Sequence, residues 1–167
     1  MKKQILLILA MYAWIFSASA AEGTLPPNCE AGTFCTVTTQ AEIDANSNHA
    51  PVTVIAIDSQ NCIYCKIMEP VIKELATEYK GRVQFLKLDQ YYNVRLAFPL
   101  QNRGTPNYFM FNHDIFTGNV LRGAPVSDGL IIMRELPDLM SMTQEEKMDF
   151  VRPYGKRNFK LWLDPYL

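Results

Sequence analysis

Several features that would indicate a common function are absent from this chain. Its 16 Lys and Arg residues nearly balance its 17 Asp and Glu residues, so no basic excess favours nucleic-acid binding. The sequence has no internal repeats and no low-complexity segments, which excludes repeat architectures. Histidine is scarce, because His49 and His113 are the only two. The chain therefore predicts neither a nucleic-acid-binding protein nor a histidine-rich metal site.

Long apolar runs are scarce too, and the notable one lies at the N-terminus. Lys2 and Lys3 precede an apolar stretch over residues 5–16, and small residues follow over residues 17–20. This order is typical of a secretory signal peptide that is cleaved after Ala20 or Ala21. A membrane span needs roughly 20 apolar residues, and an uncleaved anchor is the alternative. We expect residues 1–20 to be removed and the mature protein to be periplasmic, where disulfides persist.

Removal of that segment leaves roughly 147 residues, which is the size of one domain. Strand and helix patterns alternate along it. They predict a strand over residues 33–38, a helix from a capping box at Thr39 to about residue 46, a strand over 52–58, a helix over 62–81 and a strand over 83–89. Because a helix joins the last two strands, we expect them to be parallel.

The second half of the chain shows weaker patterns. They predict a short helix over residues 94–102 that Pro99 disturbs, a hairpin of residues 106–112 and 120–122 with its turn at 114–119, a helix capped by Ser127 over 128–136, and a last helix from a capping box at Thr143 to about residue 151. The basic and aromatic residues that follow could dock a partner or pack on the domain. Together the elements predict an α/β fold.

The most informative motif is Cys62-Ile63-Tyr64-Cys65, which lies between a predicted strand and a predicted helix. This placement puts Cys62 at the helix N-terminus, where unpaired backbone N–H groups and the helix dipole favour an anion. Thiolate is the reactive form of cysteine in disulfide exchange. The motif therefore predicts a stabilised thiolate with a second thiol one turn away.

Other residues extend this motif into a family resemblance. Pro70 follows Cys65 by five positions, and Gly104-Thr105-Pro106 lies further downstream. In these residues and their spacing, residues 52–136 resemble the thioredoxin family, which carries a cis-proline beside the active site at that distance from the cysteines. The resemblance implies a central mixed β-sheet flanked by helices, preceded by a first β-α unit in residues 21–51. Residues 137–167 would form a C-terminal helical extension packed on the core.

The resemblance also implies a role for each matching residue. Cys62 would be the attacking thiolate, and Cys65 the more buried resolving thiol. Pro106 would be a cis-proline beside them, binding substrate together with Tyr64 and Thr105. The alternatives are a metal site at the two cysteines, which lacks two of the four ligands that zinc requires, and an ordinary trans turn at Pro106. We expect no metal and no cofactor.

Three departures from thioredoxin refine this interpretation. Asn61 replaces the usual tryptophan, while Tyr64 and Thr105 resemble the periplasmic disulfide isomerases. Those isomerases carry an N-terminal dimerisation domain, and only about thirty residues are available here. We therefore expect a monomeric reductase rather than an isomerase or an oxidase.

A further departure from thioredoxin concerns the residue that would transfer a proton. Ala56 stands where thioredoxins bury an aspartate, although its expected neighbour Lys87 is retained. Asp58 and Glu69 are the carboxylates that could substitute. The alternatives are a solvated strand-end residue for Asp58 and an (i, i+4) ion pair with Lys73 for Glu69.

With Cys62 and Cys65 assigned by the resemblance, Cys29 and Cys35 remain as a second pair. We expect a structural disulfide, and a second redox pair is the alternative.

The expected function is therefore an exported oxidoreductase that reduces or isomerises protein disulfides and accepts electrons from a periplasmic or membrane partner. The alternative is a binding or assembly module that has kept the fold without catalysis.

Overall fold

The computed structural model describes residues 29–100, 102, 104–113, 115–123 and 143–167. The predicted signal segment and the predicted helix over 128–136 lie outside these residues. The described chain forms a mixed sheet of five strands in the order β1-β3-β2-β4-β5. These strands are β1 (Phe34–Thr36), β2 (Val52–Asp58), β3 (Val83–Asp89), β4 (Asn107–Asn112) and β5 (Ile115–Arg122).

The strands run in two directions. β1 and β2 both pair with β3 in parallel, as the helix between β2 and β3 predicts. β4 pairs antiparallel with β2, and β5 pairs antiparallel with β4. β2 therefore lies at the centre of the sheet, with all seven of its residues buried. Its apolar composition follows from this position, since helices cover both faces of the sheet.

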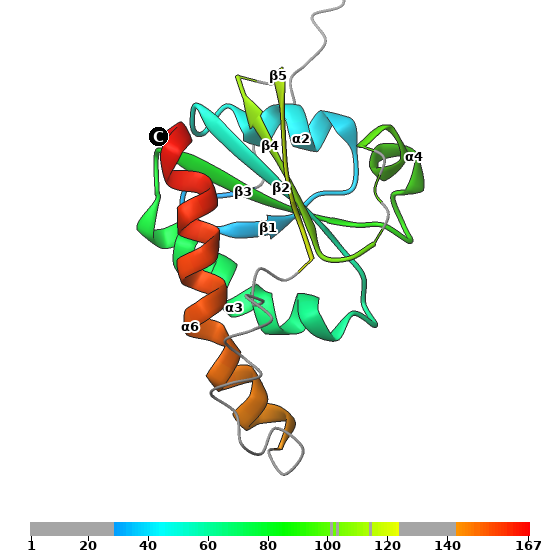
Figure 1. The fold of residues 1–167 in the computed structure, drawn as a ribbon. Helices are drawn as coiled ribbons and strands as arrows, with labels where there is room; N and C mark the ends of the chain where they lie inside the picture. Colours follow the sequence, from blue (N-terminus) through cyan, green and yellow to red (C-terminus); the bar gives the residue numbers. More distant parts are fainter. Residues whose placement is uncertain (1–28, 101, 103, 114, 124–142) are drawn as a thin grey trace, which may run out of the picture.

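The helices divide between the two faces of the sheet (Figure 1). α3 (Ile63–Glu78) and α6 (Gln144–Leu163) cover the face to which Val54 and Ala56 point. α2 (Gln40–Ser47) and α4 (Val94–Ala97) cover the other face, where Ile55 and Ile57 point. Successive residues of a strand point to opposite faces, so β2 supplies both halves of the core.

Most predicted elements are confirmed, with changes at their ends. The capping boxes at Thr39 and Thr143 are both present and open α2 and α6. The helix predicted over 94–102 is shorter. α4 ends at Ala97, and a 3₁₀ turn over Phe98–Leu100 replaces its last residues because Pro99 cannot donate a backbone hydrogen bond.

The predicted hairpin turn over 114–119 is wrong. β5 already begins at Ile115, and the chain reverses at His113, whose φ is 45°. Phe116 packs on Phe111 of the neighbouring strand, with ring centroids 5.4 Å apart. Cross-strand aromatic contacts of this kind extend the ladder through residues whose local pattern suggested a turn.

The predicted end of the last helix, near residue 151, is also wrong. α6 continues through Pro153 to Leu163, and a short 3₁₀ turn over Asp164–Tyr166 follows. Phe159 and Leu163 are fully buried in the core beneath the sheet. Their burial holds the helix together beyond the proline, which local sequence alone does not predict.

Within the part of the chain that the structure describes, no helix combines the length and the apolar character that a membrane crossing requires.

Candidate active site

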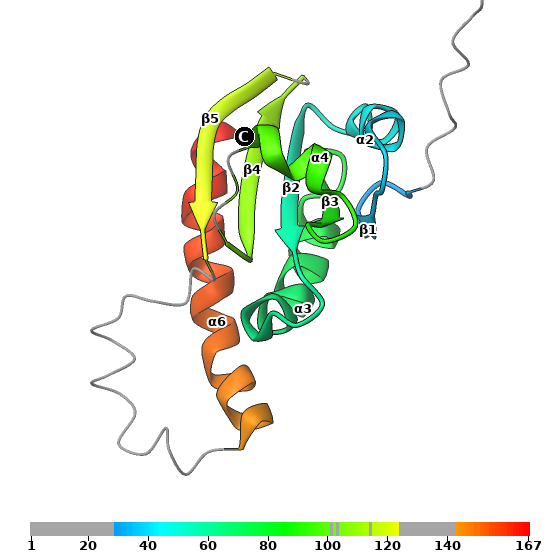
Figure 2. The same cartoon turned by 90° about the vertical axis from the view of Figure 1, so that its right-hand side faces the viewer.

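The cysteine motif lies at the edge of the sheet where the parallel strands end. Figure 2 looks onto this edge, with the end of β2 and the start of α3 facing the viewer. The N–H of Cys62 donates to the carbonyl oxygen of Ser59 at 3.0 Å, which closes the turn between β2 and α3. This turn makes Cys62 the N-cap residue of α3, as the sequence predicts.

The two sulfur atoms differ in their surroundings. The Sγ of Cys62 accepts a hydrogen bond from the backbone N–H of Cys65 at 3.1 Å, and Cys62 as a residue is half-buried. Cys65 is buried on the apolar side of the helix. In the structure the two cysteines form a disulfide. Once it is reduced, the same N–H group and the helix dipole favour a thiolate at Cys62.

Pro106 lies beside this pair and follows a cis peptide bond from Thr105. Pro106 and Cys65 both line a cavity of about 10 Å³. Other side chains around that cavity come from β2, from α3 and from β4, among them Ala56, Asp58, Glu69 and Tyr108. Tyr64, between the cysteines, is more than half exposed. The structure therefore brings Tyr64, Thr105 and Pro106 to the edge that carries Cys62.

A lysine bridges the two candidate carboxylates beneath the site. The Nζ of Lys87 lies 2.9 Å from the Oδ2 of Asp58 and 3.2 Å from the Oε2 of Glu69. Asp58 is buried, so its interpretation as a solvated strand-end residue is wrong. Glu69 does pair with Lys73, at 2.7 Å, and shares its second oxygen with Lys87.

These contacts shift the pKa values of the bridge. Hydrogen bonding from Lys73 and then from Lys87 lowers the pKa of Glu69, although partial burial opposes the shift. Burial alone would lower the pKa of Lys87, but hydrogen bonds and Coulomb attraction from Asp58 and Glu69 outweigh it and raise the pKa. Lys87 is therefore charged at neutral pH and forms ion pairs with both Asp58 and Glu69.

Asp58 also lies close to both sulfur atoms. One of its carboxylate oxygens and the sulfurs of Cys62 and Cys65 lie within 4.8 Å of one another. This group offers three donors to a metal ion, one fewer than a closed zinc site. Neither His49 nor His113 belongs to it. The proximity instead suits a carboxylate that exchanges a proton with a cysteine.

The sequence patterns did not predict a series of hydrogen-bonded side-chain amides that connects the loops at this edge. The buried Asn107 donates to Asn102 at 2.6 Å and to the carbonyl oxygen of Gly104 at 2.9 Å. Its own amide oxygen accepts from the N–H of Gly123 at 3.1 Å, and Asn102 donates to Gln90 at 2.8 Å. A polar residue at the head of an otherwise apolar strand was the available signal. These hydrogen-bonded amides hold the segment before Pro106 against the ends of β3 and β5.

The second cysteine pair forms the disulfide Cys29–Cys35. Cys29 is buried in the core on the α2 face, and its N–H donates to the side chain of Asn46 at 3.0 Å. The bridge therefore fixes the start of the described chain against α2 and β1.

Comparison with known proteins decides the family. The sequence model described as Thioredoxin matches residues 34–131, which is more than half of the chain. The chain belongs to the thioredoxin family. Members of this family are generally disulfide oxidoreductases, and the Cys62–Cys65 pair fits a redox function. The matched range contains every candidate site residue except Cys29.

Solved thioredoxins share this fold. Thioredoxin f from spinach chloroplast, in its short form, is 27% identical, with a TM-score of 0.53 over 64% of this chain and 95% of that one. A thioredoxin from Halobacterium salinarum is 19% identical, with a TM-score of 0.52 over 76% of this chain and 95% of that one, which shows the fold alone. Thioredoxin f2 in a complex with ferredoxin:thioredoxin reductase is 25% identical, with a TM-score of 0.53 over 64% and 97%.

Proposed function

We propose that this protein is an exported thiol–disulfide oxidoreductase that acts as a monomer and reduces protein disulfides. The observation that supports it most is the difference between the two sulfurs. Cys62 is the partly exposed N-cap of α3 and accepts a backbone hydrogen bond, whereas Cys65 is buried one turn later. The attacking thiolate must be accessible to the substrate disulfide, whereas the resolving thiol only has to reach the sulfur of the attacking cysteine.

The reaction would begin with the dithiol form. The thiolate of Cys62 attacks one sulfur of a substrate disulfide, so a Cys62–substrate bond forms and the other substrate sulfur leaves as a thiolate. Cys65 then loses its proton and attacks the sulfur of Cys62. The mixed bond breaks, the Cys62–Cys65 disulfide forms, and the substrate has gained two electrons as two thiols.

Asp58 is the group that we assign to the proton of Cys65. Its carboxylate lies within 4.8 Å of that sulfur and on the cavity that Cys65 lines. The volume of about 10 Å³ is near the minimum for one water, which would suffice to relay a proton. Lys87 forms an ion pair with this carboxylate at 2.9 Å, and Glu69 contacts Lys87 at 3.2 Å.

A reductase needs a source of electrons. The thioredoxin f2 mentioned above is solved in a complex with ferredoxin:thioredoxin reductase, a protein partner. We propose that this chain likewise receives electrons from a protein, located in the periplasm or its membrane. The periplasmic location rests on the N-terminal segment alone, with its two lysines, apolar run and small residues.

Trapping tests this function. We expect Cys65→Ala to accumulate mixed disulfides between Cys62 and its partners, because resolution is blocked, and Cys62→Ala to lose insulin reduction and all trapping. Mass spectrometry of the trapped species would identify donor and substrates together. A Cys62→Ser/Cys65→Ser variant that restores a deletion strain fully would instead support the non-catalytic binding module.

A further inference from the structure

We infer that a cavity between α2 and α4 binds a small apolar molecule that carries a single carboxylate. This cavity, called the α2–α4 cavity below, has a volume of about 190 Å³. Among the residues that the structure describes, it shares no lining residue with the small cavity beside Cys65. The inference therefore concerns a ligand site that the proposed disulfide chemistry does not use.

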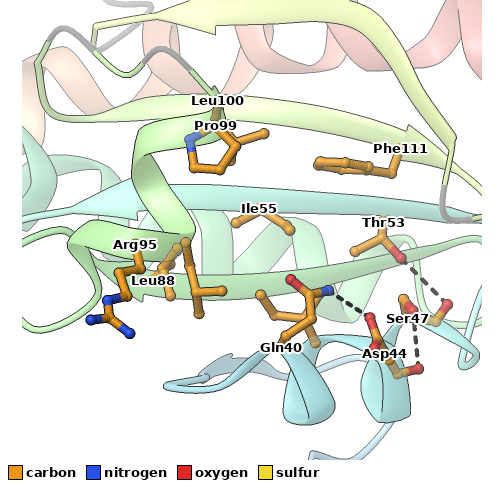
Figure 3. Close-up of a pocket in the computed structure, with 12 residues that line it drawn as sticks. Gln40, Asp44, Ser47, Thr53, Ile55, Leu88, Arg95, Pro99, Leu100 and Phe111 are labelled. Atoms are coloured by element: carbon orange, nitrogen blue, oxygen red, sulfur yellow. Dashed lines mark hydrogen bonds between the residues drawn. The ribbon is translucent and has the colours of Figure 1, made fainter.

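The lengths of the helices explain why this face of the sheet is hollow. α3 and α6 cover one face with 16 and 20 residues, whereas α2 and α4 cover the other with 8 and 4. Figure 3 shows Pro99 and Leu100, in the 3₁₀ turn after α4, on one side of the cavity and Gln40 of α2 on the other, with Ile55 of β2 between them. The cavity is thus the gap that the two short helices leave over the central strands.

The walls of the α2–α4 cavity are mostly apolar. They consist of three buried side chains and three partly buried ones of the same core cluster: Ile43, Ile55, Leu88, Leu96, Leu100 and Phe111. Natural cores contain few voids larger than one water molecule, and an apolar cavity of about 150 Å³ in another protein stays dry and binds benzene. The α2–α4 cavity therefore accommodates an aromatic ring or a short alkyl chain, whose burial is favourable.

The polar groups on the α2 side of the cavity already have partners. The side-chain amide of Gln40 donates to the carboxylate of Asp44 at 2.6 Å, and the hydroxyl of Ser47 donates to the backbone carbonyl of Asp44 at 3.1 Å. The hydroxyl of Thr53 donates to the carbonyl oxygen of Ser47 at 3.4 Å. These hydrogen bonds are satisfied within the protein, so they do not select the ligand.

Arg95 supplies the charge that selects it. Its side chain is exposed and lines the cavity from α4, and Figure 3 shows it at the end away from Asp44. Within the described chain, none of the ion pairs includes Arg95. A guanidinium presents a planar fork of N–H donors that matches the two oxygens of a carboxylate. A ligand whose apolar part fills the cavity would therefore place an anionic group at Arg95.

Asp44 limits the charge of that group to one. Its carboxylate lines the same cavity, so it repels further negative charge. A phosphate group would carry roughly two negative charges at neutral pH, whereas a carboxylate carries one. The lining thus favours a monocarboxylate with an apolar body over a phosphate ester.

Three probes of one shape test this site: 3-phenylpropionate, the neutral 3-phenylpropanamide and the cationic 3-phenylpropylamine. We expect calorimetric titration of the oxidised protein to show saturable binding of the carboxylate at one site per chain. It should bind about tenfold more tightly than the amide, because a charged hydrogen bond to Arg95 adds to the same apolar contacts. The amine should bind no more tightly than the amide. In NMR spectra, the carboxylate should shift the methyl signals of Ile55 and Leu88.

Two variants separate the charged part of the ligand from its apolar part. Arg95→Gln keeps the apolar walls, so it should weaken binding of the carboxylate about tenfold and leave binding of the amide unchanged. Leu100→Trp places a larger side chain at the cavity and should weaken binding of all three probes. The matched control is Arg157→Gln, which changes an exposed arginine on α6, beyond the opposite face of the sheet. It should bind the probes as the wild-type protein does.

Several results would overturn the inference. The wild-type protein could show no saturable binding, or bind the carboxylate no more tightly than the amide or the amine. Equal loss of carboxylate binding in Arg95→Gln and Arg157→Gln would reduce the effect to net charge, and unshifted methyl signals of Ile55 and Leu88 would place the probe elsewhere. Circular dichroism would verify that each variant is folded. If Leu100→Trp is not, Arg95→Gln and the methyl signals still decide.

Discussion

Asp58 and Lys87 give this site its individual character at the scale of residues. Ala56 occupies the position at which thioredoxins bury an aspartate, yet a carboxylate is still present near the cysteines. Asp58 lies two residues further along β2, on the same strand face, and reaches both Lys87 and the sulfurs. Register explains why the lysine is retained: Lys87 lies opposite Ala56 in the parallel ladder, within reach of Asp58. The carboxylate that pairs with Lys87 therefore lies two residues further along β2 than the aspartate of thioredoxins.

Asp58→Asn tests this assignment. We expect it to slow resolution of the mixed disulfide by roughly tenfold or more, because the amide cannot accept the proton of Cys65. The measurement is the rate of mixed-disulfide decay by rapid quench between pH 6 and pH 9, since a lost base changes the pH profile and a purely structural defect does not.

Glu69→Gln is the matched comparison for that experiment. It removes the second carboxylate on Lys87 but leaves the one beside the sulfurs, so its effect should be smaller than that of Asp58→Asn. Insulin reduction by both variants at the wild-type rate throughout that pH range would show that neither carboxylate serves as the base.

At the scale of elements, α6 is the helix whose stability depends most on tertiary contacts. Lys156 and Lys160 pair with Glu74 and Glu78 on α3, across the outer surface. Exposed pairs of this kind contribute little, so the buried side of the helix decides its stability. There the ring of Phe159 meets that of Tyr108 edge to face, with centroids 4.8 Å apart. The helix is thus part of the core rather than an appendage.

Phe159→Ala should therefore be costly. Removing a fully buried phenylalanine leaves a cavity among Phe85, Tyr108 and Trp162, and we expect a loss of about 3–5 kcal/mol in the free energy of unfolding. The control on the same helix is Leu161→Ala, which is exposed and should change stability by less than about 0.5 kcal/mol. Urea denaturation of the oxidised proteins measures both. Equal losses would mean that α6 does not contribute to the core in this way.

At the scale of the whole molecule, we expect the two disulfides to have different tasks. Cys62–Cys65 spans one helical turn at the start of α3, whereas Cys29–Cys35 joins the start of the described chain to β1, beside α2. The first crosslink has to open and close during the proposed reaction. The second contributes to stability by restricting the unfolded chain.

Selective reduction would distinguish these tasks. At low concentrations of dithiothreitol, we expect alkylation and mass spectrometry to label Cys62 and Cys65 while Cys29 and Cys35 stay joined, because the N-terminus of α3 favours a thiolate at Cys62 and so makes its sulfur the better leaving group. Complete reduction should then lower the midpoint of thermal unfolding, because the chain loses its second crosslink. Simultaneous opening of both bridges at equal reductant would favour a second redox pair and contradict the structural assignment.

The sequence by itself determined the order of the elements and the position of the reactive pair. β-branched runs, helical periodicity and the capping boxes at Thr39 and Thr143 are local signals, and the spacing of Cys62, Cys65, Pro70 and Pro106 defines a family pattern. The tertiary structure alone decided where α6 ends and where β5 begins, because buried contacts of Phe159 and cross-strand packing of Phe116 outweigh local turn and proline signals. It also decided that Asp58, Lys87 and Glu69 form one bridge, and that Asn107 and Asn102 connect the segment before Pro106 to the ends of β3 and β5. These residues are distant in sequence, and only the register of the sheet and the path of the loops bring them together.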